Sequence, residues 1–344
     1  MRRNLALFVG LVVVLSACEA SMRVPASAVG SGSGSGSGSS SHSKPGKTEA
    51  PKPPPPLADK QAKPYGIAID NDSVYWGNHA DFTLMKVAKA GGAPAKLGSV
   101  AGGLGPDAIA VDDQFVYASV WGDHGSPDAK DSKIVKVPKA GGAVTDVATP
   151  IVSTSSIALD ATHVYWVDDA SHVIWRVAKA GGAPQKVVDG YVEMQNVVVD
   201  DTNVYFAGTK GMKIPIVKAP KTGGAATELV PNSNARVVTV DAQNVYFMLR
   251  TDGGRGDLAM HKVAKAGGAV TMVGKPKEGA MVLFMAGTTL YASHRGERDI
   301  WKMPVAGGEA TTVVSMKPGA HSIAVDDTSV YWTDGVATVN KAPR

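Results

Sequence analysis

The sequence contains a single cysteine, Cys18, among its 344 residues. One cysteine cannot form a disulfide within the chain, so the fold must depend on packing and not on covalent cross-links. Apolar runs are also short, because none approaches the roughly 20 residues that a membrane-spanning helix needs. The formal net charge is only +4 and no block of basic residues stands out. This charge pattern argues against a dedicated nucleic-acid-binding protein.

Several catalytic signatures are missing as well. The sequence has no Ser-His-Asp order, no HExxH motif and no Cys/His cluster, and no helix follows its glycine pairs as a phosphate-binding loop would require. We therefore expect no cofactor, no metal and no catalytic residue that can be named in advance. No amphipathic segment of helix length appears either, which points to an all-β fold.

The N-terminus reads as a secretion signal. Arg2 and Arg3 precede an apolar stretch from Leu5 to Leu15, which is too short to span a bilayer and matches a signal-peptide core. The residues Leu15-Ser16-Ala17-Cys18 resemble a bacterial lipobox. That resemblance implies cleavage before Cys18, lipidation of its thiol with palmitate-type acylation of the new N-terminus, and a place in the bacterial cell envelope as an outer-membrane lipoprotein, periplasmic or surface-exposed. An ordinary signal peptide with an incidental cysteine is the alternative.

A low-complexity segment follows the lipobox. Gly30 to Ser41 is nearly all glycine and serine, and Pro51 to Pro56 is almost all proline. Such a composition cannot bury enough apolar surface to fold, so we expect a disordered tether. The predicted organisation is a signal peptide over 1–17, an acylated Cys18 with its tether over 18–56, and a folded body over 57–344.

The folded body is built from repeats. One unit consists of Ile67-Ala68-Ile69-Asp70, then Val74-Tyr75-Trp76, then Leu84 to Val87, then a Gly-Gly pair and a short alternating run. Four short β-like runs in about 40–45 residues are the size of one propeller blade. The tyrosine recurs seven times, at Tyr75, Tyr117, Tyr165, Tyr205, Tyr246, Tyr291 and Tyr331.

The ends of the repeat region support a count of seven. The last unit stops at Arg344 after a third strand expected at Val336 to Lys341, and Pro55 to Ala58 stands where a fourth strand is missing. We predict a seven-bladed β-propeller of four-stranded blades, closed by one N-terminal and three C-terminal strands. Such closure removes an exposed sheet edge. Six or eight blades remain alternatives.

The repeat resembles the YWTD propellers of lipoprotein-receptor ectodomains and similar repeat propellers of bacterial lipoproteins. Tyr331-Trp332-Thr333-Asp334 matches literally, Tyr165-Trp166-Val167-Asp168 is close, and other units keep only the aromatic character. The resemblance covers essentially all of 57–344 and implies the fold more than a function, because propellers host unrelated functions.

Two repeated features invite functional readings. An aspartate ends the first strand of six units. It could bind calcium, but capping of the following turn is the better interpretation, because Asp accepts hydrogen bonds from nearby backbone amides. The Lys-Ala-Gly-Gly segments form turns between third and fourth strands, and we expect their lysines to make a solvated rim on one face. A catalytic group would not recur in every blade.

The loops that do not repeat are the better candidates for function, because variable loops on a rigid scaffold usually carry binding. Among them Trp121 is an aromatic in a polar loop that we expect to be exposed. The candidate binding face comprises His79, Asp81, Trp121, Asp123, His124, Asp169, His294, Arg295, Asp299 and His321.

Three functions remain open at this stage. The leading hypothesis is a monomeric, non-enzymatic binding or scaffolding lipoprotein with an unknown protein or carbohydrate ligand, held to the membrane by its lipid. The second is a lyase or hydrolase with a His/metal site at the central funnel, like the streptogramin-lyase propellers, for which His294, His321 and Asp299 are the first residues to inspect. The third is a structural envelope protein.

Overall fold

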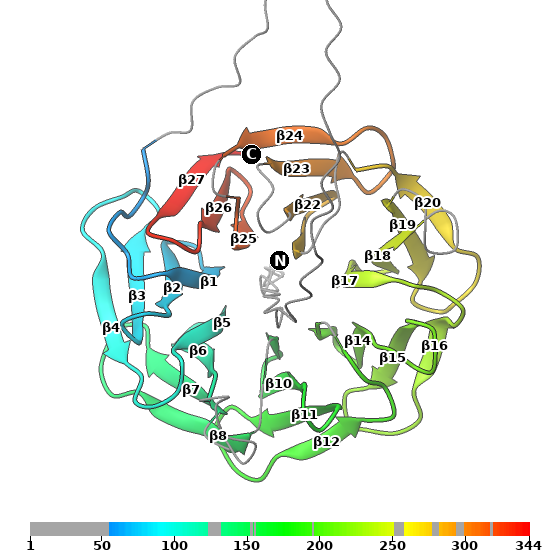
Figure 1. Cartoon of the computed structure of the whole chain (residues 1–344), viewed down its shortest axis with the longest axis horizontal. Helices are drawn as coiled ribbons and strands as arrows, with labels where there is room; N and C mark the ends of the chain where they lie inside the picture. Colours follow the sequence, from blue (N-terminus) through cyan, green and yellow to red (C-terminus); the bar gives the residue numbers. More distant parts are fainter. Residues whose placement is uncertain are drawn as a thin grey trace, which may run out of the picture.

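A computed structural model describes residues 55–344 except 123–131, 152–153, 155, 195, 251–257, 277–281, 294–298 and 317–318. It confirms the seven-bladed β-propeller, with seven antiparallel sheets around a central axis (Figure 1) and no helix among the described residues. The lipobox, Cys18 and nearly all of the tether lie outside the described residues.

Each of the first four blades has four strands that run outward from the axis in chain order. Blade 1 consists of β1 (Pro64–Ile69), β2 (Ser73–Asn78), β3 (Thr83–Ala88) and β4 (Ala95–Ser99). Blade 2 consists of β5 (Pro106–Val111), β6 (Phe115–Val120), β7 (Ser132–Pro138) and β8 (Thr145–Ile151). Blade 3 consists of β9 (Ile157–Leu159), β10 (His163–Asp168), β11 (Val173–Ala178) and β12 (Gln185–Val188). Blade 4 consists of β13 (Val198–Val199), β14 (Asn203–Ala207), β15 (Ile216–Pro220) and β16 (Thr227–Val230).

The last three blades complete the ring. Blade 5 consists of β17 (Arg236–Val240), β18 (Asn244–Arg250), β19 (Leu258–Ala264) and β20 (Thr271–Gly274). Blade 6 consists of β21 (Val282–Ala286), β22 (Thr289–Ser293), β23 (Asp299–Pro304) and β24 (Thr311–Ser315). Blade 7 has three strands, β25 (Ser322–Val325), β26 (Ser329–Thr333) and β27 (Val339–Pro343). The inner strand β1 lies beside both β5 and β25, so blade 7 meets blade 1 and the ring is closed.

The apolar residues of each repeat hold neighbouring blades together. Successive side chains of a strand point to opposite faces of its sheet. In β2, Trp76 therefore packs in a cluster with Tyr331 of blade 7, whereas Tyr75 packs with Ile109 of blade 2. Both aromatic rings are fully buried. The two neighbouring aromatic residues of β2 thus pack between blades on opposite faces of their sheet.

The closure between the chain ends lies where the sequence predicted it, but it is shorter. Ala58 forms a single bridge to Val339 of β27, with hydrogen bonds of 2.9 and 3.0 Å, and no full fourth strand forms. The physical reason is proline: Pro55 and Pro56 precede this bridge and have no backbone N–H to donate to a neighbouring strand. Blade 7 therefore borrows one bridge from the N-terminal segment instead of a strand.

The strand order gives the propeller two different faces. The turns from first to second and from third to fourth strands lie on one face, which we call the constant face because its turns repeat. The loops from second to third strands and the connections between blades lie on the opposite face, which we call the variable face.

Candidate functional site

The aspartate at the end of each first strand caps the turn that follows it. In blade 1, the Asp70 Oδ1 atom accepts hydrogen bonds from the amides of Asp72 and Ser73 at 2.9 and 2.8 Å. Its Oδ2 atom accepts the hydroxyl of Tyr75 at 2.8 Å. The turn-cap interpretation is therefore confirmed. The same Asp–Tyr pair recurs at Asp112–Tyr117, Asp160–Tyr165, Asp200–Tyr205, Asp241–Tyr246 and Asp326–Tyr331.

The lysines of the Lys-Ala-Gly-Gly turns do not form a solvated rim, so that expectation was wrong. Each reaches back to the Asp–Tyr pair of the preceding blade, and its side chain is only 13–21% exposed. Several of the ammonium groups also lie over the tyrosine ring, as Lys265 does at 5.1 Å from the Tyr205 centroid. The ion pairs are Lys139–Asp70, Lys179–Asp112 at 2.9 Å, Lys221–Asp160 at 2.7 Å, Lys265–Asp200 at 2.7 Å and Lys89–Asp326 at 2.6 Å.

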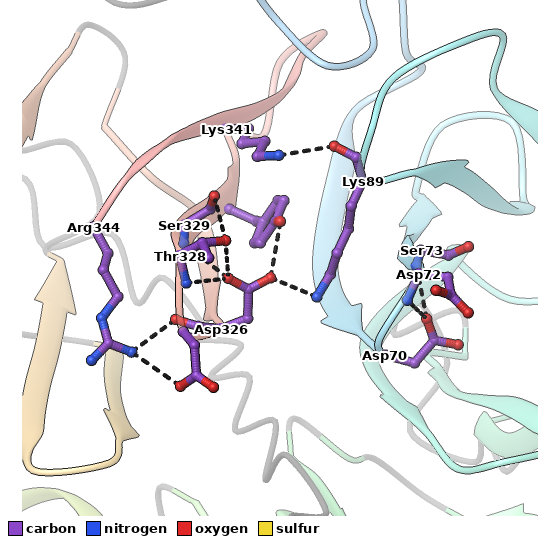
Figure 2. Close-up of polar contacts among 11 residues, drawn as sticks. Asp70, Asp72, Ser73, Lys89, Asp326, Thr328, Ser329, Lys341 and Arg344 are labelled. Atoms are coloured by element: carbon purple, nitrogen blue, oxygen red, sulfur yellow. Dashed lines mark hydrogen bonds and ion pairs between the residues drawn. The ribbon is translucent and has the colours of Figure 1, made fainter.

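We call these residues the Asp–Tyr–Lys belt, and Figure 2 shows it where the ring closes. Lys89 of blade 1 reaches Asp326 of blade 7, while the ammonium of Lys341 donates to the Lys89 carbonyl at 2.9 Å. Arg344 donates to the backbone carbonyl of Asp326 at 2.9 Å. Charged residues of the constant face are thus used to join blades.

The belt perturbs the acidity of its members. Burial alone would raise the pKa of Asp200, but hydrogen bonds from Lys265, from the amides of Asn203 and Thr202, and from Tyr205 outweigh it and lower that pKa to about 2. Burial and the hydrogen bond to Asp326 raise the pKa of Tyr331 to about 12. The carboxylates are therefore ionised and the tyrosines neutral at physiological pH, which is the pairing the belt requires.

The belt is broken at blade 6. Ala286 stands where the other blades have the aspartate, and Val305 stands where they have the lysine. Asp241 of blade 5 therefore keeps its contact with Tyr246 but receives no ammonium among the described residues. On the other side of blade 6, the guanidinium of Arg344 lies over the Tyr291 ring at 6.0 Å.

On the variable face, three rings from three separate segments form a stack beside the inner strands of blades 7 and 1. Tyr65, at the start of β1, lies between His79 and His321, with ring centroids 4.5 and 4.1 Å apart and interplanar angles of 17° and 16°. His79 follows β2 and His321 precedes β25. The stack brings together two of the histidines that the sequence singled out, and Tyr65 is the residue that sequence reasoning missed.

Polar atoms without a partner gather at this same junction. The Nδ1 atom of His79 and the Oγ atom of Ser322 are buried and have no hydrogen-bond partner among the described residues. Elsewhere polar groups near the inner strands join neighbouring blades: Asn196, before β13 of blade 4, makes two hydrogen bonds with the backbone of Val238 in blade 5, at 2.8 and 3.1 Å. Because buried polar groups are nearly always paired, an orphan in a native fold calls for an explanation.

The other described residues of the candidate face are not members of the ring stack. Asp81 is exposed and accepts hydrogen bonds from the amide and hydroxyl of Thr83, in its own turn. Trp121 is half-buried and not exposed as expected, because its indole N–H donates to the carbonyl of Thr154 at 2.6 Å. Asp169 lies half-buried in the loop after β10.

Asp299 begins β23 and accepts hydrogen bonds from Thr312 and Ser315 of the outer strand β24, at 3.1 and 2.6 Å. This carboxylate is therefore tied to the outer part of blade 6 and is not brought to His321. Four of the predicted residues lie outside the described residues, namely Asp123, His124, His294 and Arg295.

No group of three or more His, Cys, Asp or Glu side chains in the described part of the chain is arranged to hold a metal ion. Within the same residues, no helix is long and apolar enough to cross a membrane.

Comparison with known proteins supports the fold. No protein-family model and no curated protein matches the chain. Among solved structures, virginiamycin B lyase from Staphylococcus aureus is similar at 15% identity and a TM-score of 0.63, over 82% of this chain and 95% of that one. A chain of a nidogen–laminin complex is similar at 15% identity and a TM-score of 0.52, over 68% and 89%.

A puromycin-hydrolysing peptidase of Mycobacterium tuberculosis is similar at 13% identity and a TM-score of 0.55, over 77% of this chain and 56% of that one. At these identities the likeness extends to the propeller fold alone. The similar structures include a propeller of the YWTD type, which the tetrapeptide at 331–334 suggested, and propellers of proteins named as a lyase and a hydrolysing peptidase.

Proposed function

We propose that this protein is a non-enzymatic binding propeller that takes a protein or carbohydrate partner on its variable face, beside the ring stack between blades 7 and 1. The observation that carries the proposal is the stack of Tyr65 between His79 and His321. Three aromatic rings from non-repeating positions stack there, whereas five lysines of the constant face are already paired with aspartates of the belt.

Exposure on the same face supports the proposal. Phe82, in the loop after His79, is 37% exposed. Most of the large apolar side chains that are exposed also lie on this face, in loops or connections, namely Phe82, Leu104, Val192, Met212 and Val336.

An array of envelope glycans and peptides tests the proposal. The full chain is compared with a Phe82→Ala variant and with a matched constant-face variant, Lys96→Ala in the exposed part of β4. We expect Phe82→Ala to weaken the retained ligands at least tenfold and Lys96→Ala to leave them unchanged. Ligands that bind both variants as they bind the unaltered chain would place binding away from the variable face and overturn the proposal.

A lyase is the second candidate, and the structural neighbours favour it. They include virginiamycin B lyase and a catalytically inactive histidine-to-alanine variant of that enzyme with quinupristin. In this chain His321 is the described histidine nearest the start of an inner strand, and His294 lies outside the described residues. Incubation with quinupristin, followed by mass spectrometry, tests this candidate. A new product that forms with the unaltered chain and disappears with His321→Ala supports a lyase, and unchanged quinupristin contradicts it.

We further propose that the propeller is tethered to the bacterial outer membrane through a lipid on Cys18. Several acyl chains, each contributing about 0.8 kcal/mol per buried CH₂, would hold it stably. Fractionation of cells that express Cys18→Ser should move the protein from the membrane to the soluble fraction. Retention of this variant on membranes would contradict the lipid anchor, and a purely structural envelope role would then depend on some other contact.

A further inference from the structure

The ring stack also indicates which chemical group the ligand carries, and this inference rests on the proposed function. Tyr65 fixes the planes of both imidazoles, because each is stacked on one of its faces within 4.5 Å. Neither face of the phenol is therefore open to a ligand ring. The polar groups that the two imidazoles can offer a ligand are the ring nitrogens at their edges.

The His79 edge offers a hydrogen-bond donor. Its Nδ1 atom is buried without a partner among the described residues, while the side chain as a whole is only half-buried, so Nε2 lies on the accessible side. A buried N–H without an acceptor is less tolerable than a buried lone pair, so the proton belongs on Nε2. Burial and the nearby Lys63 charge lower the pKa of His79, which keeps the ring in this neutral form.

A cation lies next to that donor. Lys63 is exposed and has a φ of +56°. Its backbone carbonyl accepts a hydrogen bond from the His79 amide at 2.9 Å, which holds the two residues side by side. No ion pair engages its ammonium among the described residues. Two acidic groups of the same face are already engaged: Asp81 accepts the hydroxyl of Thr83, and Asp334 caps its own loop by accepting the amides of Val336 and Ala337 at 2.8 Å.

Two exposed apolar side chains, Phe82 and Leu104, lie on the loop and the connection next to His79. The connection to blade 2 passes so close to His79 that a Cβ at Gly105 would lie 2.3 Å from the His79 carbonyl oxygen, and only glycine fits there. This close approach places Leu104, which is 39% exposed, beside the loop that carries Phe82. The loop and the connection are joined by a hydrogen bond from the Val100 amide to the Phe82 carbonyl at 2.8 Å.

We infer that the variable face binds a carboxylate carried on an apolar ring or sugar face, with His79 Nε2–H and Lys63 holding the carboxylate and Phe82 with Leu104 covering the ring. Charge-assisted hydrogen bonds to a carboxylate are about twice as strong as neutral ones, so a charged acceptor suits this pair better than a hydroxyl or an amide. A sugar acid and an acylated amino acid share this chemistry, and the test separates them.

Titration calorimetry of the full chain at low ionic strength, with two matched pairs of probes, tests the inference. The first pair is D-glucuronate and methyl glucoside, and the second is N-acetylphenylalanine and its amide. We expect the carboxylate of at least one pair to bind tenfold or more tightly than its neutral counterpart, and the pair that does so identifies the source. Equal affinities within both pairs, or no binding of any probe, would overturn the carboxylate assignment.

Two variants separate the donor from the stack. His79→Phe keeps a ring on Tyr65 but removes the N–H, and Lys63→Ala removes the cation; each should weaken the carboxylate probe at least fivefold, while Lys60→Ala should leave it unchanged. If neutral and charged probes bind equally well and both lose affinity in Phe82→Ala, the binding face is supported and the carboxylate assignment is rejected. Probes that are indifferent to Phe82→Ala would reject the binding face itself.

Discussion

The junction between blades 4 and 5 and the junction between blades 5 and 6 are nearly the same structure with one side chain removed. At the first, Asp200 accepts hydrogen bonds from Tyr205 and Lys265, both at 2.7 Å. At the second, Asp241 accepts the hydroxyl of Tyr246 at 2.8 Å, and in place of a lysine the side-chain carboxamide of Asn244 makes two contacts of 3.5 Å with its carboxylate. Since both junctions close, the packed Val, Tyr and Met side chains are sufficient for the fold, and the lysine adds to it.

Replacing the aspartate of each junction tests this comparison, and we expect the largest loss of stability from these variants. Asp200→Ala removes the acceptor of Lys265, of Tyr205 and of two amides, and should lower the free energy of unfolding by about 3 kcal/mol. Asp241→Ala removes the same acceptor without a lysine and should cost about 2 kcal/mol. Urea unfolding measures both, with Asp201→Ala, an exposed neighbour, as the control. Equal losses at the two junctions would mean that the lysine contributes nothing.

The comparison can also be sharpened by supplying the missing lysine. Val305→Lys places an ammonium at the position from which Lys265 reaches Asp200, and should stabilise the protein by about 0.5–1 kcal/mol. Val305→Met is the matched control because it supplies length without charge. The gain should vanish when Asp241 is replaced by Asn. A melting temperature that rises as much for Met as for Lys would assign the gain to packing.

The smallest expected effect is the pH dependence of the stability that Asp200 contributes. Because the folded-state pKa of Asp200 is lowered to about 2 from an ordinary value of 3.8, its contribution is present above pH 4 and is lost as the pH falls towards 2. The stability gap between the unaltered chain and Asp200→Asn should therefore narrow between pH 4 and pH 2 and stay constant from pH 5 to 7. Unfolding curves in urea across this range measure it. A gap that stays wide at pH 2.5 would exclude ionisation of Asp200 as its source.

The fold could be predicted from the sequence because each repeat carries the same local signals. Short β-branched runs, the Asp turn and the Gly-Gly turn recur in register, so errors in one unit are corrected by the others. The length of the closing strand was overestimated because Leu57 and Ala58 fit a fourth-strand pattern, while the two prolines before them remove the donors that a strand needs.

The contacts that matter at the site could be predicted only in part. The Asp turn cap is local and was foreseen, whereas the partner of Lys265 lies 65 residues earlier in the chain, so no pattern within one repeat reveals it. The same holds for the ring stack, which joins Tyr65 to a histidine near the other end of the chain. One signal was present: Tyr65 and His321 occupy the same repeat position, two residues before Ile67 and Ile323, where the repeat otherwise varies between blades.

The ring is closed by residues from its two ends, since Lys89 pairs with Asp326 across 237 positions and Ala58 pairs with Val339. During synthesis these partners can meet only after the strands of blade 7 have left the ribosome. Until then the flank of blade 1 that carries Ile67 and Trp76 has nothing to pack against, and contacts so distant in sequence form slowly. A nascent chain that stalls before β25 and β26 are complete therefore leaves an open ring with an apolar flank.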